Sequence, residues 1–345
     1  MSSLDIYDYN LPPELIAHAP AWPRDSARLM VYDTKTDIVS FCTIRDLFEK
    51  IPSSLIVVND TKVLPARIAG EHKDESIELL VLVDQGFSSD GMVRALVNRR
   101  VRSGEQVLVN GVTFTVIEDH EKSMLLRANT GKRQLLQLLH DAGETPLPPY
   151  ISSEFDEEQR RVQYQSMFAV KAPSVAAPTA SLHFTPELVR RLTDNGSEFA
   201  SVTLQVGLGT FAPVFEEHFE SRQLHTERYV VPRRTANAIA ATSRALRPVL
   251  AVGTTVVRTL EAAKRSLATG RESSGVTDLF IYPPHHFTYP DLLMTNFHVP
   301  RSSLMCLVEA YLQHKGAKSS LVELYQLAIA ERLRFYSFGD AMLIL

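Results

Sequence analysis

Cysteine is scarce in this chain of 345 residues, which contains only Cys42 and Cys306. Neither has a second cysteine nearby, so the sequence builds no disulfide framework and no CxxC site for zinc or redox chemistry. Two thiolates are also too few to hold an iron–sulfur cluster. We therefore expect both thiols to be reduced and structural.

Long apolar runs are missing as well. The chain has no stretch of about 18 consecutive apolar residues, the length that a membrane-spanning helix needs. The first segment, MSSLDIYDYN, carries acids where a secretory signal has a basic start and an apolar run. We expect a cytoplasmic protein without membrane contact, and take a monomer as the default oligomeric state.

The signatures of several enzyme classes are absent. No HExxH, EF-hand, GxSxG or P-loop pattern occurs, which disfavours zinc proteases, calcium sensors, α/β-hydrolases and NTP-hydrolysing enzymes. His285 and His286 are adjacent, and adjacent side chains in extended backbone point to opposite sides. We therefore expect no metal site.

The chain has little excess charge, with a formal net charge of −4. Nucleic-acid binding would therefore require basic residues to cluster on one face. Four arginines fall within nine residues that contain no acid: Arg94, Arg99, Arg100 and Arg102. This cluster predicts contact with phosphate groups, and a solvated loop is the competing interpretation.

The pattern of apolar residues changes twice along the chain. Residues 1–67 mix short helical and strand-like runs, whereas residues 68–145 hold closely spaced β-rich runs separated by turns. From residue 146 onward, helices and strands alternate again. The sequence predicts an α/β main domain, a layered sheet with helices, built from residues 1–67 and 146–345. A small antiparallel β-barrel domain is inserted at residues 68–145.

Two glycine-containing turns are candidates for ligand binding. Gly207-Leu208-Gly209 lacks the rest of the GxGxxG motif, and Pro213 follows where a helix should begin, so we reject a Rossmann cofactor site. Glycine here either lets a ligand approach the backbone or makes a plain tight turn. In VGTTVVRTLE, a buried strand runs through Gly253 into a helix whose free N–H groups favour an anion or a carboxylate.

Eight motifs, in order along nearly the whole chain, resemble those of a known family. They are NDTKVLPAR, PLPPYI, AAPTASLHFT, VGLGTFAPV, VGTTVVRTLE, TDLFIYP, TNFHVPRSSL and FGDAMLI. Strings of this length at consistent intervals are far more specific than one short pattern. The chain closely resembles the S-adenosylmethionine:tRNA ribosyltransferase-isomerase family of queuosine biosynthesis.

The resemblance implies an activity. Members of the family transfer and isomerise the ribosyl portion of S-adenosylmethionine onto 7-aminomethyl-7-deazaguanine at the wobble position of tRNA, giving epoxyqueuosine in tRNA, adenine and methionine. In the mechanism usually proposed, a base removes a proton from the ribose carbon next to the sulfonium, and the amine attacks the sugar as adenine leaves. S-adenosylmethionine is then the co-substrate and tRNA the partner, without a metal.

The same motifs imply a set of site residues. The proton-transfer candidates are His183 and His298, and the carboxylates that orient groups or balance the sulfonium charge are Asp278 and Asp340. For Asp340, capping of the turn after Gly339 is an equally good interpretation. The candidates for binding the co-substrate, with turn and cap duties as the alternative, are Thr179, Gly207, Gly209, Thr210, Thr254, Thr255, Thr295 and Asn296. The candidates for holding the RNA are Arg67, Arg94, Arg99, Arg100 and Arg102.

The chain departs from the family pattern at Ser181, Gln205, Val276 and Pro284. Gln205 replaces the histidine of the usual HVGLGTF motif. If that histidine is the essential base, this chain is a divergent paralogue that uses S-adenosylmethionine on another acceptor, or a noncatalytic tRNA-binding relative. If the histidine only braces the turn, glutamine keeps the hydrogen bond. Both alternatives stay open on the sequence alone.

Overall fold

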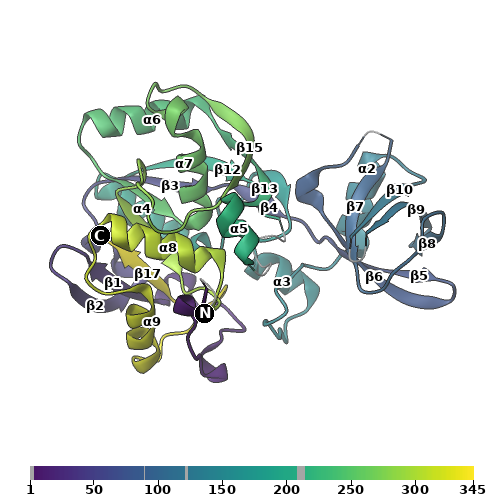
Figure 1. The fold of residues 1–345 in the computed structure, drawn as a ribbon, viewed down its shortest axis with the longest axis horizontal. Coiled ribbons are helices and arrows are strands. Elements are labelled where there is room, and N and C mark those ends of the chain that lie inside the picture. Colours follow the sequence, from purple (N-terminus) through teal and green to yellow (C-terminus); the bar gives the residue numbers. More distant parts are fainter. Residues whose placement is uncertain (1–3, 89, 121–122, 208–213) are drawn as a thin grey trace.

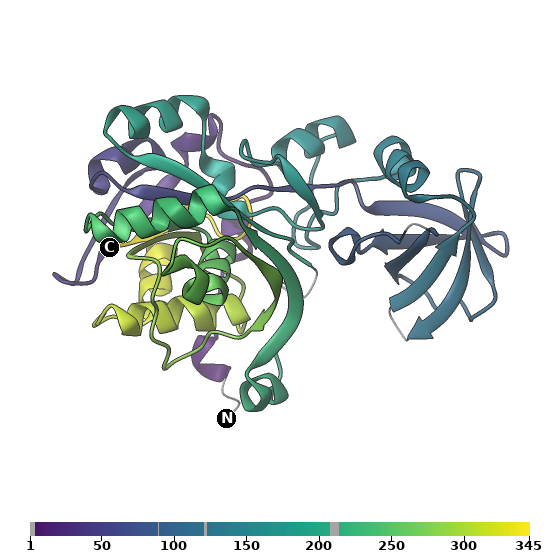
Figure 2. The ribbon, with the colours of Figure 1, turned by 90° about the horizontal axis from the view of Figure 1, so that it is seen from above.

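The computed structural model describes residues 4–88, 90–120, 123–207 and 214–345. The main body is a nine-stranded mixed sheet with helices on both faces, and a closed six-stranded barrel projects from one side of it (Figures 1 and 2). This arrangement confirms the predicted fold class, an α/β main domain with an inserted antiparallel β-barrel.

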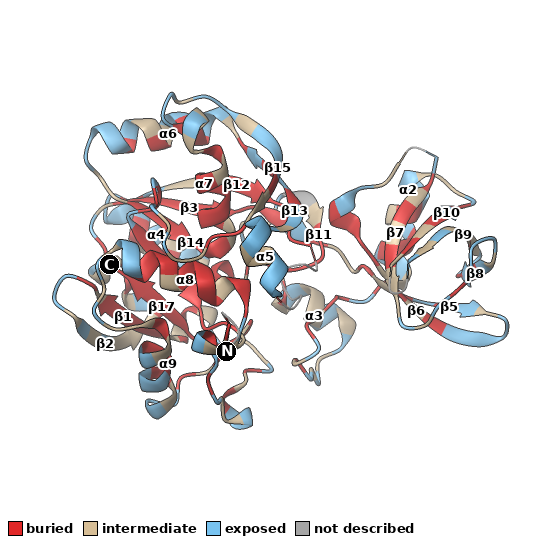
Figure 3. Ribbon diagram, in the orientation of Figure 1, coloured by how far each residue is buried: buried red, intermediate tan, exposed pale blue. Residues whose placement is uncertain are grey.

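The strands of the main sheet lie in the order β15–β13–β12–β3–β14–β16–β17–β1–β2. Their bounds are β1 (Arg28–Asp33), β2 (Ile38–Thr43), β3 (Leu55–Asn59), β12 (Glu198–Leu204), β13 (Gln223–Val231), β14 (Val249–Val252), β15 (Ser273–Leu279), β16 (Leu292–Asn296) and β17 (Ala341–Ile344). β12, β3, β14 and β16 are parallel, and β17 runs antiparallel to β16. Every residue of β3, β14 and β16 is buried (Figure 3). Their apolar sequences follow from this position, because central parallel strands are covered on both faces.

Helices cover the sheet on its two faces. Their bounds are α1 (Leu47–Lys50), α4 (Pro186–Asp194), α6 (Arg233–Arg244), α7 (Thr254–Leu267), α8 (Ser303–His314) and α9 (Leu321–Ala330). Successive residues of a strand face opposite sides. Leu55 and Val57 of β3 accordingly belong to the core that α6, α7, α8 and α9 cover, whereas Ile56 and Val58 belong to the core under α1 and α4. The main domain is thus a three-layer α/β/α structure.

The barrel has its own core. Its strands are β5 (Arg67–His72), β6 (Glu75–Val81), β7 (Met92–Val97), β8 (Gln106–Val109), β9 (Val112–His120) and β10 (Ser123–Ala128), closed in the order β10–β7–β6–β5–β8–β9. The helix α2 (Lys132–Ala142) packs Leu135, Leu138 and Leu139 against this core. These elements occupy residues 67–142, and the domain limits of 68 and 145 stay a prediction.

The two chain crossings between the domains lie side by side. The short strand β4 (Thr61–Val63) leads from the sheet toward the barrel, and it pairs in parallel with β11 (Lys171–Ser174) on the way back. The remaining elements are α3 (Glu157–Gln163), α5 (Glu216–Ser221) and the 3-10 helices η1 (Asp5–Tyr7), η2 (Pro13–Leu15), η3 (Arg24–Ser26), η4 (Ile44–Asp46), η5 (Val83–Gln85) and η6 (Thr179–His183). None of the helices in the described ranges has the length and apolar character to cross a membrane.

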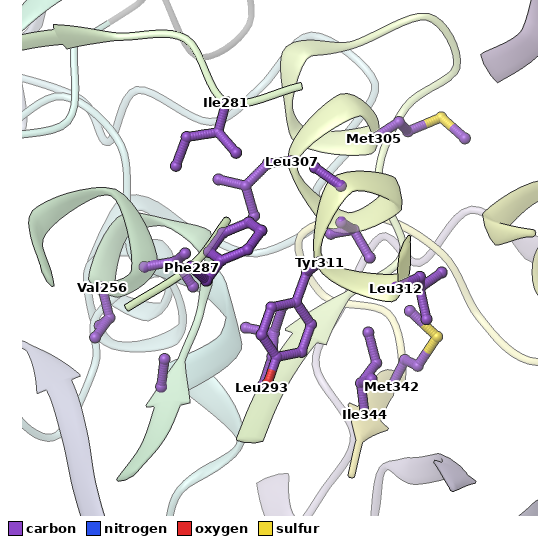
Figure 4. Packing of buried hydrophobic residues seen from close by; sticks show 14 of the residues in the cluster. Val256, Ile281, Phe287, Leu293, Met305, Leu307, Tyr311, Leu312, Met342 and Ile344 are labelled. Carbon is purple, nitrogen blue, oxygen red and sulfur yellow. The ribbon is translucent and has the colours of Figure 1, made fainter. Parts of the chain in front are cut away.

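Figure 4 shows how the larger core of the main domain is filled. Tyr311 and Leu312 of α8 point toward the sheet, where Leu293 of β16 and Ile344 of β17 meet them. All four side chains are almost completely buried. The stability of the main domain therefore depends on the fit between α8 and the strands that end at one edge of the sheet.

We expect truncation in this core to be far more destabilising than the same truncation on the surface. Leu293 is fully buried, whereas Leu246 is 92% exposed. Leu293→Ala should lower the free energy of unfolding by about 2–5 kcal/mol, because it removes apolar contacts and leaves a cavity. Leu246→Ala, the matched control, should change it by less than about 0.5 kcal/mol. Denaturant titration followed by circular dichroism measures both, and equal losses would contradict this packing.

Candidate active site

A cavity lies at the edge of the sheet where the parallel strands β12, β14 and β16 end. Its walls include the residues Val206, Gly253 and Phe297, which come just after these three strands. From β3, the chain returns to the sheet first as β12 on one side and later as β14 on the other, so the strand order reverses at β3. Ligands of α/β proteins bind beyond the carboxyl ends of the strands at such a reversal.

Five of the eight residues predicted to bind the co-substrate line this cavity, together with His298. The five are Thr179, Thr254, Thr255, Thr295 and Asn296. Gly207 lies one residue beyond Val206, which is also on the wall. Gly209 and Thr210 lie outside the described residues. Segments that are far apart in the sequence therefore meet at one place.

The amino terminus of α7 forms one wall. Gly253 precedes it with φ of 95°, a conformation that glycine adopts without steric cost, and its N–H donates to the Met294 carbonyl of β16 at 2.8 Å. The helix then begins with Thr254 and Thr255, whose N–H groups have no acceptor within the helix. Among the described residues, the buried Thr255 Oγ1 also has no hydrogen-bond partner. This corner suits an anionic group.

Asn296 presents an unused acceptor beside the cavity. Its Nδ2 donates to the Tyr336 carbonyl at 3.2 Å and contacts His183 Nε2 at 3.5 Å. Its Oδ1 is buried and has no partner in the described part of the chain. His183 itself lies behind Asn296 and is absent from the lining of the cavity. The arrangement makes His183 a support for Asn296, and its predicted proton-transfer role stays a prediction.

His298 is on the cavity wall and is held from both ring nitrogens. Nε2 lies 3.2 Å from Thr295 Oγ1, and Nδ1 lies 3.4 Å from the hydroxyl of Tyr325. The Tyr9 hydroxyl also donates to the His298 carbonyl. Burial lowers the pKa of His298 to about 3 and that of His183 to about 4. Both imidazoles are therefore neutral near pH 7.

The two predicted carboxylates are in different places. Asp340 is buried beside the start of β17 and accepts hydrogen bonds from the backbone N–H of Arg28 at 3.0 Å and of Arg334 at 2.8 Å. These bonds fit the capping interpretation, and the predicted functional role of Asp340 stays a prediction. Asp278 is on β15, at the far edge of the sheet. Because successive side chains of a strand point to opposite faces, Asp278 and its neighbour Thr277 face opposite sides of the sheet. Neither carboxylate lines the cavity.

Gln205 makes the bracing hydrogen bond that one of the two alternatives required. Its Nε2 donates to the Pro173 carbonyl at 3.0 Å, which ties the end of β12 to β11. Ser181, another departure from the family pattern, donates through Oγ to the Pro178 carbonyl at 2.7 Å. Val276 is exposed on β15. Nothing in the structure explains the presence of Pro284.

The predicted RNA-binding arginines are mostly neutralised by acids of the barrel. Arg67 pairs with Glu78, Arg94 with Glu118, Arg99 with Glu75 and Arg100 with Asp119. Within the described ranges, Arg102 alone of the five has no carboxylate within 4 Å of its side chain. Carboxylates thus occupy four of the five guanidinium groups, and contact with RNA stays a prediction.

A buried charged cluster next to Gly207 was not predicted from the sequence. Glu227 of β13 forms an ion pair with Arg258 of α7, and its Oε1 accepts from the Gly207 N–H at 3.4 Å. Asp84 of η5 is 8% exposed, and burial together with nearby Glu227 raises its pKa to about 6. Arg258, a charge among apolar residues in VGTTVVRTLE, was the one signal in the sequence. No signal in the sequence pointed to Asp84 or Glu227, because they come from different domains and are far apart along the chain.

These features define a class of protein: an α/β domain with a ligand cavity at the carboxyl edge of its parallel strands and an inserted β-barrel. A profile of the family described as queuosine biosynthesis protein matches residues 4–344, so the chain belongs to that family. This confirms the resemblance drawn from the eight motifs.

Relatives are similar over their whole length. The S-adenosylmethionine:tRNA ribosyltransferase-isomerase of Thermotoga maritima is 44% identical over 347 residues, with 98% of each chain covered. The protein of the same name from Trichlorobacter lovleyi is 42% identical over 344 residues, again with 98% of each covered. A crystal structure of S-adenosylmethionine tRNA ribosyltransferase from Thermotoga maritima superposes with a TM-score of 0.55 and 32% identity, covering 98% of this chain and 99% of that one.

The two buried imidazoles should make the folded state sensitive to acid. Their pKa values of about 4 and about 3 lie below the value of 6.5 for an unperturbed histidine, so the unfolded chain binds more protons in between. Each histidine should therefore lower the free energy of unfolding by about 1.4 kcal/mol per pH unit as the pH falls from 6.5 toward 4. The free energy of unfolding is measured by denaturant titration at several pH values in this range. It should fall less steeply with decreasing pH in His183→Gln and His298→Gln than in the wild type. A variant whose free energy of unfolding depends on pH as steeply as that of the wild type would contradict the lowered pKa of that histidine.

Proposed function

We propose that this chain is an S-adenosylmethionine:tRNA ribosyltransferase-isomerase. It transfers and isomerises the ribosyl moiety of S-adenosylmethionine onto 7-aminomethyl-7-deazaguanine at the wobble position of tRNA, and it releases adenine and methionine. The observation that carries the proposal is the cavity, which gathers five predicted co-substrate residues in a chain 44% identical to a relative of that name. The hydrogen bond from Gln205 to the Pro173 carbonyl supports the alternative in which this position only braces the turn.

The methionine carboxylate of S-adenosylmethionine binds at the amino terminus of α7. This end of a 14-residue helix offers free N–H groups and a positive dipole, and both favour an anion. The Thr255 hydroxyl, which is buried without a partner among the described residues, donates to the carboxylate. No basic side chain is needed for this contact.

The ribose and adenine lie toward Asn296 and the apolar wall. The free Oδ1 of Asn296 accepts a hydrogen bond from a ribose hydroxyl, and His183 keeps the amide in this orientation. Val299, Leu304 and Tyr336 line the same cavity and provide the apolar surface that a purine ring needs.

His298 faces the reacting part of the co-substrate. Burial keeps its imidazole neutral, so it does not repel the sulfonium, and a neutral ring nitrogen is able to accept a proton. Thr295 and Tyr325 fix the ring orientation.

The tRNA approaches from the side of the barrel. Four arginines of the barrel exchange their carboxylate partners for phosphate groups of the RNA. Arg102, which has no carboxylate partner among the described residues, contacts a phosphate directly. We place the enzyme in the cytoplasm, where it acts as a monomer without a metal.

The reaction is tested by incubating the purified protein with S-adenosylmethionine and tRNA that carries 7-aminomethyl-7-deazaguanine. We expect adenine release in proportion to a ribosyl-derived mass gain of the wobble nucleoside, measured by chromatography and mass spectrometry. Intact substrates beside an active family member would overturn the proposal. Adenine release with a small amine in place of tRNA would favour a divergent paralogue.

Replacement of the Thr255 hydroxyl should weaken co-substrate binding. Thr255→Val keeps the shape of the side chain but removes the donor to the carboxylate, so the KM for S-adenosylmethionine should rise by about 10-fold or more. Thr259→Val is the matched control, because the Thr259 hydroxyl is already bonded to the Thr255 carbonyl at 2.8 Å within the helix. Equal KM values for the two variants would contradict the assignment.

A further inference from the structure

A second cavity lies between the barrel and the main sheet. Asp84 of η5 and Arg94 of β7 line it from the barrel side, and Gln205 and Arg228 line it from the main domain. Gln205 and Val206 are neighbours, yet Gln205 faces this junction cavity while Val206 faces the active-site cavity. Successive residues of an extended chain point to opposite sides. The two cavities therefore share one thin wall, the segment 205–207.

Gly207 has no side chain, so the Asp84 carboxyl group lies directly against this wall. A Cβ at this position would stand 2.7 Å from Asp84 Oδ2, so only glycine allows the carboxyl group to approach the backbone so closely. Asp84 thus lines the junction cavity directly against the wall that it shares with the active-site cavity.

Asp84 is a buried carboxylate with an unused acceptor atom among the described residues. It is 8% exposed, and its Oδ1 has no hydrogen-bond partner among the described residues. Burial of a carboxylate without a partner is unfavourable, so such groups are normally paired with a cation or with donors. An incoming donor would satisfy this atom.

The neighbouring charges leave room for a cation. Arg258 is paired with Glu227, and Arg94 is paired with Glu118 at 3.5 Å. In the part of the chain that the structure describes, no basic group lies within 4 Å of the Asp84 carboxylate, although the Glu227 carboxylate is near enough to raise its pKa. Glu227 thus has a guanidinium partner in Arg258, whereas the Asp84 carboxylate has none within this distance among the described residues.

We propose that Asp84 binds the protonated primary amine of the acceptor nucleotide and thereby selects a base that carries an aminomethyl group. The proposal rests on the proposed function, and it adds the recognition of the acceptor. The amine is small enough to reach the backbone of Gly207, on the other side of which the co-substrate lies. Arg228, which is exposed at the mouth of the junction cavity, meets the phosphates of the same RNA.

Binding without S-adenosylmethionine tests this recognition apart from catalysis. The probes are a tRNA with the aminomethylated base and the same tRNA with a neutral nitrile in place of the amine. The wild type should bind the amine form about 10- to 100-fold more tightly, the range for a hydrogen bond to a charged group. Asp84→Asn should bring this ratio near one and leave the affinity for the nitrile form unchanged.

Two further variants separate recognition from folding. Asp119→Asn removes an acid that pairs with Arg100 elsewhere on the barrel, and it should keep the wild-type ratio. Gly207→Ala places a Cβ against Asp84 Oδ2 and should reduce the ratio as Asp84→Asn does, which keeps the proposal testable if Asp84→Asn does not fold. An undiminished preference for the amine in folded Asp84→Asn, or in Gly207→Ala, would overturn the proposal.

The assay of adenine release distinguishes the two proposals. A wild type that prefers the amine form but releases no adenine would overturn the proposed function and support the role of Asp84. A wild type that releases adenine but binds both tRNAs equally would overturn the role of Asp84 alone.

Discussion

The structure depends on one constraint, the burial of parallel strands between two layers of helices. Strands covered on both faces need apolar side chains along their length, so polar side chains concentrate where the strands end. Because β12, β14 and β16 run in the same direction, their ends meet at one edge. Each strand is followed by a residue that lines the cavity: Val206 after β12, Gly253 after β14 and Phe297 after β16. The direction of the strands therefore decides where the site lies.

Desolvation then sets the chemistry of this edge. It keeps His183 and His298 neutral, so no imidazolium opposes a cationic co-substrate. It also makes unpaired polar atoms unfavourable, at about 1–3 kcal/mol for each buried group. Among the described residues, three such atoms belong to residues that line the two cavities. Thr255 Oγ1 and Asn296 Oδ1 belong to the active-site cavity, and Asp84 Oδ1 belongs to the junction cavity. A substrate that satisfies them would recover this free energy on binding.

The inserted barrel shows where reasoning from local sequence succeeds and where it stops. Closely spaced β-rich runs predicted the barrel itself, because strand pattern and turn residues are local signals. The four arginines between Arg94 and Arg102 looked like a basic patch, since no acid lies within those nine residues. Antiparallel pairing brings Glu75, Glu118 and Asp119 against three of them from other strands. Charge neutralisation across a sheet depends on register, which a short window of sequence does not contain.

By itself, the sequence determined the fold class, the position of the inserted barrel and the family, because these rest on local periodicity and on long ordered motifs. It also named six of the 18 residues that line the cavity. Only the tertiary structure decided their positions: His183 lies behind Asn296, Asp340 accepts backbone hydrogen bonds and Asp278 lies on an edge strand. The tertiary structure alone brought Asp84 to Gly207, across the boundary between the domains. Proton affinity and partner choice depend on burial and distance, and both are properties of the folded chain.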